Sequence, residues 1–270
     1  MSAAVDAVTQ APPGDARVSF AGAVSAEWIK FRTLRSTLAV LGAAMLGMLV
    51  IGVIVGFNTR HLTRNLQPDD VVQSSTLQGY YLAQLLIGAL GVLFVSGEYG
   101  SGMIRSSFAA VPRRLPVLWA KIIVFVVVTF PAMLLMCFVT FLAAQGVISS
   151  ARPGFSLGDP GVLRVVVGTA GYLTLIGVLG GMLGWIVRNT PGALVAYFAT
   201  VLVLPVIFGN VLGTWGKDIA QFMPSNAGSS FAASLPESPS LSPTIGLIVL
   251  LAWVAVAVAI AAAQLSRRDA

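Results

Sequence analysis

Six long apolar runs constrain the fold of this chain more than any other feature of its sequence. They lie at about residues 37–57, 75–95, 117–144, 162–187, 193–213 and 244–265. An α-helix rises about 1.5 Å per residue, so about 20 residues cross the roughly 30 Å hydrocarbon core of a bilayer. Because backbone polar groups inside a bilayer must satisfy one another, runs of this kind form helices. The sequence therefore predicts an all-α polytopic membrane protein with six transmembrane helices.

The composition agrees with a membrane protein and argues against binding of nucleic acid. Of the 270 residues, 57% are apolar and only 10% are charged, whereas soluble domains have about a quarter of charged residues. The formal net charge is +6, which in a soluble protein would suggest a nucleic-acid partner. Here the basic residues flank the apolar runs, as they do in membrane proteins whose cytoplasmic loops are positive. No nucleic-acid partner is expected.

The distribution of basic residues predicts which side of the membrane each loop faces. With both termini in the cytoplasm, eleven of the sixteen lysines and arginines fall on the inner side. Cytoplasmic loops carry such an excess, so we expect a multi-pass protein of the bacterial plasma membrane with both termini inside. Residues 1–18 contain prolines, a glycine and two aspartates without apolar periodicity, which is typical of a disordered tail. Residues 19–268 would form a single transmembrane domain.

An amphipathic pattern precedes the first apolar run. Phe20, Val24, Trp28 and Phe31 recur at helical spacing, and charged residues flank this stripe. One interpretation is a helix in the membrane interface, with its tryptophan at headgroup depth; the other is a cytoplasmic extension of the first span. The predicted interfacial residues are Trp28, Phe31, Arg32 and Arg35, the last of which must snorkel to water.

A basic segment, residues 96–121, separates the second and third apolar runs. It contains Arg105, Arg113, Arg114 and Lys121, which predicts a cytoplasmic position. Ile104, Phe108 and Val111 recur at helical spacing between them. We expect a short amphipathic helix on the membrane surface, available to a cytosolic partner, although simple anchoring of the positive charges on the inner side explains the arginines equally well.

The segment from about residue 214 to 243 differs from the other loops. It is too apolar for a solvated linker, and several prolines prevent it from crossing the membrane as one helix. Short helices that dip into the outer leaflet fit this pattern, provided that protein covers their backbone. Inside the third run, Pro131 predicts a kink.

The sequence contains neither the His-Glu-x-x-His motif of zinc proteases nor a Gly-x-Ser-x-Gly nucleophile elbow. His61 is the only histidine and Cys137 the only cysteine, so no metal site and no catalytic residues are expected. All acidic residues are expected in loops, tails or span ends, and Glu98, at the inner end of the second span, is the closest to the bilayer. Because no carboxylate is expected in mid-membrane, proton or sodium coupling through such a group is disfavoured. No Gly-x-x-x-x-Gly-Lys-Ser/Thr motif occurs, so any nucleotide chemistry must come from another chain.

Uncharged polar residues and glycines within the spans allow more than one interpretation. The candidate residues of a substrate path are Tyr80, Gln84, Tyr197 and Asn210. Each of them could equally form hydrogen bonds between neighbouring helices. Glycine pairs such as Gly177 with Gly181 permit close helix contacts, which could lie within the chain, face lipid or join two copies.

Several of these segments together resemble a known family. The residues are Glu27-Trp28-Ile29-Lys30-Phe31-Arg32, Ser96-Gly97-Glu98-Tyr99, Gly102-Met103-Ile104-Arg105 and Ala110-Val111-Pro112-Arg113-Arg114, in a chain with six spans. In this combination the chain resembles the permease subunits of ABC-2 type ATP-binding-cassette transporters, in particular the actinobacterial kind. The resemblance extends from about residue 20 to 268. It departs after Tyr99, where Gly100 and Ser101 occupy positions that are commonly polar or basic in relatives.

The resemblance implies a permease that pairs with a second copy or a homologous permease and binds two cytosolic ATPase subunits. These partners would bind ATP and Mg, and this chain would hold no cofactor. It also implies ATP-driven export of a hydrophobic or amphiphilic compound, such as a drug, antibiotic, lipid or peptide. Residues 97–114 would form the coupling segment, with Glu98 at its hinge. The implied ATPase contacts are Glu98, Tyr99, Ile104, Arg105, Phe108, Arg113 and Arg114. The alternative is a membrane scaffold or assembly factor that docks a cytosolic protein through the same loop without transport.

Overall fold

The computed structural model describes residues 19–59, 76–100, 115–150, 155–232 and 241–267. In these parts the chain is helical and contains no strand. The helices are α1 (Phe20–Thr33), α2 (Arg35–Thr59), α4 (Tyr80–Gly100), α6 (Leu115–Ser149), α7 (Val162–Val187), α8 (Thr190–Phe198), η2 (Ala199–Val203), α9 (Leu204–Asn210), α10 (Gly213–Ala220), α11 (Pro224–Ala232) and α12 (Pro243–Arg267).

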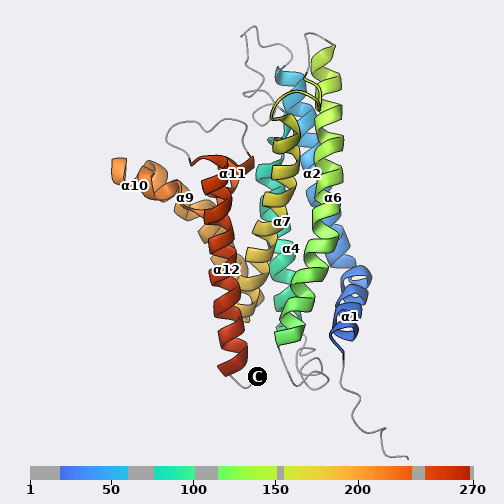
Figure 1. Ribbon diagram of the computed structural model, residues 1–270, viewed down its shortest axis with the longest axis vertical. Coiled ribbons are helices and arrows are strands. Elements are labelled where there is room, and N and C mark those ends of the chain that lie inside the picture. Colours follow the sequence, from blue (N-terminus) through green and yellow to red (C-terminus); the bar gives the residue numbers. More distant parts are fainter. Residues whose placement is uncertain (1–18, 60–75, 101–114, 151–154, 233–240, 268–270) are drawn as a thin grey trace, which may run out of the picture.

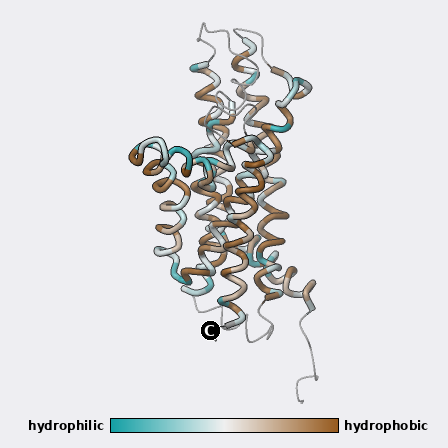
Figure 2. The backbone as a smooth tube through the Cα atoms, turned by 60° about the vertical axis from the view of Figure 1, so that its left-hand side comes forward, coloured by the Kyte–Doolittle hydropathy of each residue, from teal (hydrophilic) through white to brown (hydrophobic). Residues whose placement is uncertain are grey.

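Six helical segments of the described chain are long and apolar enough to cross a membrane, as the sequence predicts. They are α2, α4, α6, α7, the continuous segment Thr190–Asn210 and α12. Figure 2 shows apolar residues along these helices and hydrophilic ones mainly near their ends and around the two short helices α10 and α11. The all-α, multi-pass architecture is therefore confirmed.

Two central helices, α4 and α7, form the core of the bundle. They pack against each other; α2 and α6 cover one side, and α12 lies on α7 (Figure 1). In the most apolar stretch of each helix, 61% of α4 and 72% of α7 are buried, against 22% for α2 and α12. The outer helices thus leave most of their apolar surface to lipid or to other chains.

Glycines explain why α4 and α7 approach so closely. A Cβ atom added at Gly91 would overlap the carbonyl oxygen of Gly177, and one added at Gly180 would overlap that of Gly88. The backbones of the two helices are therefore in direct contact, as small residues permit. Of the three positions that the sequence left open for these glycines, the structure shows the contact within the chain.

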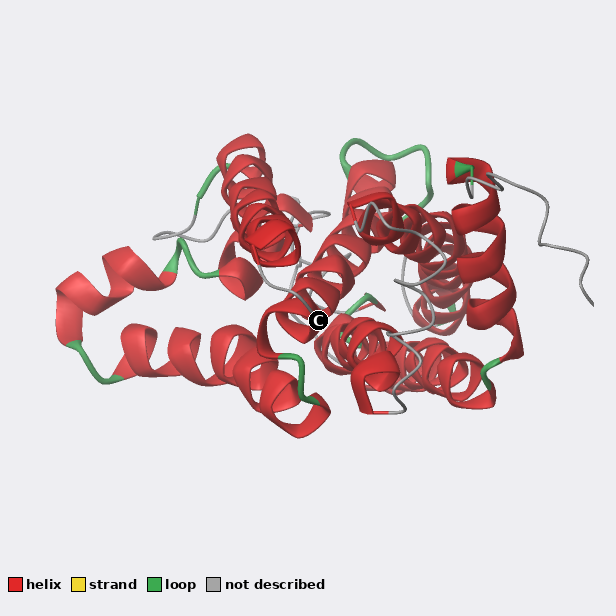
Figure 3. Cartoon of the chain, turned by 90° about the horizontal axis from the view of Figure 1, so that it is seen from below, coloured by secondary structure: helices red, strands yellow, loops and turns green. Residues whose placement is uncertain are grey.

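The fifth span changes its winding part of the way along. Asn189 caps its start, with its Oδ1 accepting a hydrogen bond from the Gly192 amide at 2.9 Å. The π-turn η2 then precedes α9, where Pro205 has no N–H to donate to the carbonyl of Val201. The first part, α8, packs against α4 and α7, whereas α9 mainly contacts η2 and α10. Seen from below, this segment extends away from the bundle (Figure 3).

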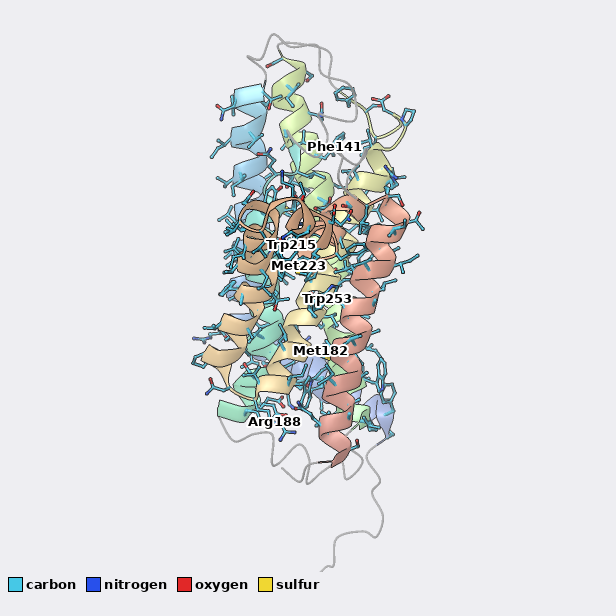
Figure 4. The ribbon with its side chains drawn as sticks, turned by 90° about the vertical axis from the view of Figure 1, so that its left-hand side faces the viewer. Phe141, Met182, Arg188, Trp215, Met223 and Trp253 are labelled. Atoms are coloured by element: carbon cyan, nitrogen blue, oxygen red, sulfur yellow. The ribbon has the colours of Figure 1, made fainter. Side chains whose placement is uncertain are left out.

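Two short helices, α10 and α11, follow the fifth span, as predicted for this region. Trp253 of α12 donates a hydrogen bond from its Nε1 to the carbonyl of Phe222, between the two helices, at 2.9 Å. In Figure 4, Trp215, Met223 and Trp253 lie in the same region beside α12. Gly246, near the start of α12, lies against Ala227 and Ser230 of α11, so α11 flanks the first part of α12 (Figure 1). The depth of the two short helices in a membrane stays a prediction.

The basic segment is more helical at its ends than the sequence suggested. Residues 96–100 are the last turn of α4, and residues 115–121 are the first turns of α6. Glu98 therefore lies in the last turn of α4, and its role at the hinge of the coupling segment stays a prediction. The helix α6 is continuous through Pro131. The expected tail, residues 1–18, and the remainder of the coupling segment, including Ile104, Arg105, Phe108, Arg113 and Arg114, lie outside the described residues.

Candidate functional site

Among the described residues, four charged side chains from three helices meet where α1 packs against the end of α4 and the start of α6. These parts of the helices lie at the lower end of the bundle in Figure 1. Glu27 and Lys30 come from α1, Glu98 from α4 and Lys121 from α6. Lys121 Nζ lies 2.6 Å from Glu27 Oε2 and 2.8 Å from Glu98 Oε1. Lys30 Nζ lies 2.7 Å from Glu27 Oε1 and 2.8 Å from Glu98 Oε1. We call these four residues the charge cluster; it is the candidate functional site.

The charge cluster is buried, and its formal charges cancel. The exposed fraction is 3% for Glu27, 5% for Glu98 and 1% for Lys121, and only Lys30 is partly exposed. Ions that are removed from water are tolerated when opposite charges and hydrogen bonds replace the solvent. Lys121 is the central cation, because its ammonium contacts both carboxylates and also lies 4.5 Å from the centroid of the Phe94 ring.

The helix α1 brings two of these charges to the bundle because one of its faces is packed. Ser19 caps the helix, its Oγ accepting a hydrogen bond from the Gly22 amide at 3.1 Å. The buried residues Ala23, Glu27 and Phe31 then recur every four positions and form one face. Figure 3 shows α1 side-on next to helices that are seen nearly end-on, so it runs across the bundle axis.

The packed face of α1 differs from the apolar stripe predicted from the sequence. Glu27 was expected to flank the stripe, but it lies in the centre of the buried face. Trp28, expected in the stripe, points outward with 43% of its surface exposed. Phe31 is buried, whereas Arg32 and Arg35 are exposed. An ion pair with α6 fixes this rotation of the helix, and hydrophobic spacing along α1 contains no information about α6.

An aromatic contact accompanies the charge cluster. The ring of Phe31 is 2% exposed and meets the ring of Phe94 edge-on, with centroids 5.1 Å apart. Phe125 is also near, at 6.4 Å. Beside these rings a narrow, mainly apolar crevice runs between α4, α6 and α7, lined among others by Gly91, Phe94, Lys121, Phe125, Gly177 and Met182. Apolar packing therefore surrounds the cluster.

Lys30 remains charged at neutral pH in this environment. Its burial lowers the pKa of the ammonium, but the hydrogen bonds and charges of Glu27 and Glu98 outweigh this effect. The net result is a raised pKa. The lysine therefore joins the charge cluster as a cation at neutral pH.

Tyr99 and Ser96 connect the same end of α4 to a different neighbour. The Tyr99 ring packs edge-on against Trp185 of α7 at 5.8 Å, and the Arg188 guanidinium lies over it at 5.8 Å from the ring centroid. Figure 4 places Arg188 at this lower end. Ser96 Oγ lies 2.9 Å from Thr190 Oγ1. The predicted contact residues Glu98 and Tyr99 thus contact different helices: Glu98 contacts α1 and α6, and Tyr99 contacts α7.

The residues predicted to line a substrate path occupy two separate places. Tyr80, Gln84 and Tyr197 are buried within the chain. The Tyr172 hydroxyl donates to the side-chain oxygen of Gln84, and the Tyr197 hydroxyl donates to the Gln84 carbonyl at 2.7 Å. Asn210 is exposed at the end of α9, on the segment that leaves the bundle. The structure brings together the first three only, and a role in a path stays a prediction for all four.

The sequence contained one signal for the charge cluster that pattern reasoning did not use. Lys121 lies inside the third apolar run, and an ionisable group at such a position needs an opposite charge. Glu98 was placed near the bilayer, but its partners were not foreseen. Within the described segments, no group of three or more histidine, cysteine, aspartate or glutamate side chains could hold a metal ion. In comparisons with known proteins, no family model and no curated protein matches the chain.

Proposed function

We propose that this chain is the membrane-spanning permease subunit of an ABC-2 type ATP-driven transporter, with both termini in the cytoplasm. The observation that supports this most is the charge cluster, which ties α1 to the end of α4 and the start of α6. Residues 101–114 connect these two helices. A partner that pushes on this segment would therefore move α1 and two spans together.

Energy requirements point to a separate ATPase. Moving a two-state transporter from 1:99 to 99:1 in favour of one state needs about 5.5 kcal/mol of differential binding. The sequence has no nucleotide-binding motif to supply it. Two cytosolic ATPase subunits, which bind ATP and Mg, would close on each other and drive alternating access from the inner edge. Arg105, Arg113 and Arg114 are the proposed contacts.

A second permease copy would cover part of the exposed apolar surface. The segment Thr190–Asn210 and the residues after it expose Val195 by 68%, Val206 by 52% and Val211 by 71%. Lipid covers such surfaces in a monomer, and small or apolar faces allow helices of two copies to pack. The exported compound would be hydrophobic or amphiphilic and would move along the interface of the two copies.

The decisive experiment is copurification with an ATPase followed by transport. The chain would be coexpressed with candidate ATPases from the same genome, purified in detergent and reconstituted in vesicles. We expect a retained ATPase, and hydrolysis that rises with an amphiphilic substrate. Arg113→Glu with Arg114→Glu should weaken retention, and Lys217→Glu, remote from this segment in the sequence, is the matched control. Uphill flux by the chain alone would contradict the proposal. If a cytosolic protein without ATPase activity copurifies and no flux is measured, the scaffold alternative is favoured.

The predicted path needs a test that separates transport from folding. Because the Gln84 side chain accepts a hydrogen bond from the buried Tyr172 hydroxyl, which leucine cannot do, Gln84→Leu is expected to lower thermal stability as well as transport. The hydrogen bond from Tyr197 to the backbone carbonyl of residue 84 would remain. Asn210→Leu alters an exposed residue and should leave stability unchanged. If transport persists in a Gln84 and Asn210 double variant that still folds, these residues do not line the path.

A further inference from the structure

We propose that α1 is a latch that docks on α4 and α6 and is released from them as one unit. Among its four residues, the charge cluster contains one ion pair on each side of the contact. On α1, Lys30 pairs with Glu27 at 2.7 Å. On the bundle, Lys121 pairs with Glu98 at 2.8 Å. Docking adds two contacts across the interface, Glu27 to Lys121 at 2.6 Å and Lys30 to Glu98 at 2.8 Å.

This division of charge makes release of α1 inexpensive. Removing one partner of a buried ion pair is strongly destabilising, because an uncompensated charge stays in an apolar place. If α1 carried two carboxylates and the bundle two ammonium groups, its release would leave like charges together. In the observed arrangement, each carboxylate still contacts an ammonium after release. The charge cluster therefore determines where α1 docks on the bundle, but it does not make docking irreversible.

The apolar part of the contact also permits release. Docking buries Ala23 and Phe31 of α1. In a bilayer, acyl chains can replace such protein contacts with little hydrophobic cost. Trp28 and Ile29 already point away from the bundle, with 43% and 54% of their surface exposed. They would keep a released α1 in the membrane interface.

A single extended residue provides the hinge. Leu34 separates α1 from α2 and has φ −74° and ψ 106°, outside the helical region. Rotation about its backbone would move α1 without unwinding α2. Docked, α1 holds the inner ends of α4 and α6 at a fixed separation; released, it allows them to move. The effect of this movement on transport rests on the proposed function, but the docking equilibrium does not.

Reversing the order of charges on α1 tests the latch. Glu27→Lys with Lys30→Glu keeps the composition and the internal ion pair of α1, but places like charges opposite Lys121 and Glu98. Like charges placed against each other across an interface strongly disfavour association. The population of released α1 should therefore rise roughly tenfold or more. Adding Glu98→Lys and Lys121→Glu restores every opposite-charge contact and should return α1 to its docked position.

The measurement is a distance distribution in the full chain without an ATPase. Spin labels at Ser25→Cys and Val127→Cys, both exposed, would be introduced after Cys137→Ala removes the only native cysteine. Pulsed electron paramagnetic resonance in nanodiscs should give one main distance and a minor longer one for the native cluster. The α1 reversal should increase the longer distance, and the fourfold reversal should remove this increase. A distance distribution that the α1 reversal leaves unchanged would overturn the latch. A fourfold variant that folds but still shows the increased longer distance would overturn it as well.

Hydrogen exchange on the unmodified chain covers the case in which a reversed variant does not fold. The amides of α1 should exchange together and faster than those of α4 and α6, because a helix of 14 residues that has lost its packing contacts is only marginally stable and opens as a unit. Protection of α1 equal to that of α6 would overturn the proposal. Both measurements are made in the absence of nucleotide and partner, so they fail or succeed independently of the transport function.

Discussion

At the scale of single residues, Lys121 determines how this end of the bundle is held together. Its ammonium is 1% exposed and contacts a carboxylate from each of two other helices. Lys30 contacts the same two carboxylates, but 25% of its side chain is exposed. Water can replace part of the contacts of Lys30 and almost none of those of Lys121. The two lysines therefore form a natural comparison.

Replacing Lys121 by methionine should be far more destabilising than the same change at Lys30. The variant would leave Glu27 and Glu98 close together with only one ammonium between them. Loss of one member of a buried ion pair typically costs about 3–5 kcal/mol, and we expect a loss of this order for Lys121→Met and well under half of it for Lys30→Met. Thermal unfolding in detergent measures both. Equal shifts of the two variants would refute the central role of Lys121.

The pH dependence that comes from Lys30 should appear only in alkaline solution. Its pKa is raised in the folded protein, so its stabilising effect is complete below the pKa of an unfolded lysine, about 10.4. The effect is lost as the pH rises through the higher folded pKa. The difference in stability between the native chain and Lys30→Met should thus be constant at neutral pH and shrink above about pH 10.4. A difference that already disappears near pH 8 would contradict this assignment.

At the scale of helices, the contact of α4 with α7 depends on the absence of side chains. Gly88, Gly91, Gly177 and Gly180 bring carbonyl groups of one backbone against the other helix. Glycine in a helix interior is locally unfavourable, so the contact must compensate for it. The central position of these two helices, from which the charge cluster and the internal tyrosines are arranged, follows from this close approach.

Alanine at Gly91 should disrupt the bundle, and alanine at Gly146 should not. A methyl group at Gly91 meets the Gly177 carbonyl, whereas at Gly146 no atom lies within 4 Å of the added Cβ. Overpacking of this kind typically costs about 1–3 kcal/mol of stability. At Gly91 the atoms that the methyl group meets belong to the backbone of Gly177 and Gly181, which cannot rotate away as a side chain can. Thermal stability and yield of monodisperse protein in detergent provide the measurement. A Gly91→Ala variant as stable as Gly146→Ala would show that the helices can separate freely.

At the scale of the whole molecule, the described chain is a bundle with both of its described ends on one side. The helix α1 and the last turns of α12 lie at the same lower end in Figure 1. This agrees with the even number of spans, and the excess of basic residues assigns that end to the cytoplasm under the proposed topology. The side chains of the charge cluster lie at the same end.

Cysteine labelling in intact cells tests this orientation. In a Cys137→Ala background, Ser156→Cys lies in the connection between α6 and α7 and should react with a membrane-impermeant maleimide. Ser25→Cys on α1 should react only after the cells are permeabilised. The opposite pattern would place α1 and the charge cluster outside the cell and would end the proposed coupling to a cytosolic ATPase.

The spans, the short helices after the fifth span and the helix before the first one could all be predicted from the sequence. The charge cluster could be predicted only in part: Glu98 was recognised as close to the bilayer, whereas Glu27 was expected only to flank the apolar stripe of α1, and its burial was not foreseen. The reason is the range of the interactions. Glu27 and Lys121 are 94 positions apart, and no local periodicity connects them.

Hydrophobicity and helical spacing are properties of neighbouring residues, and they sufficed to determine six helices long and apolar enough to span a membrane and the amphipathic helix α1. The tertiary structure alone decided which glycines meet, that Gln84 is bonded inside the chain, and that α1 turns Glu27 toward Lys121. These outcomes depend on the rotation of each helix about its axis. That rotation is fixed by contacts between distant segments, where backbone overlap and unpaired buried charge are too unfavourable to tolerate another arrangement.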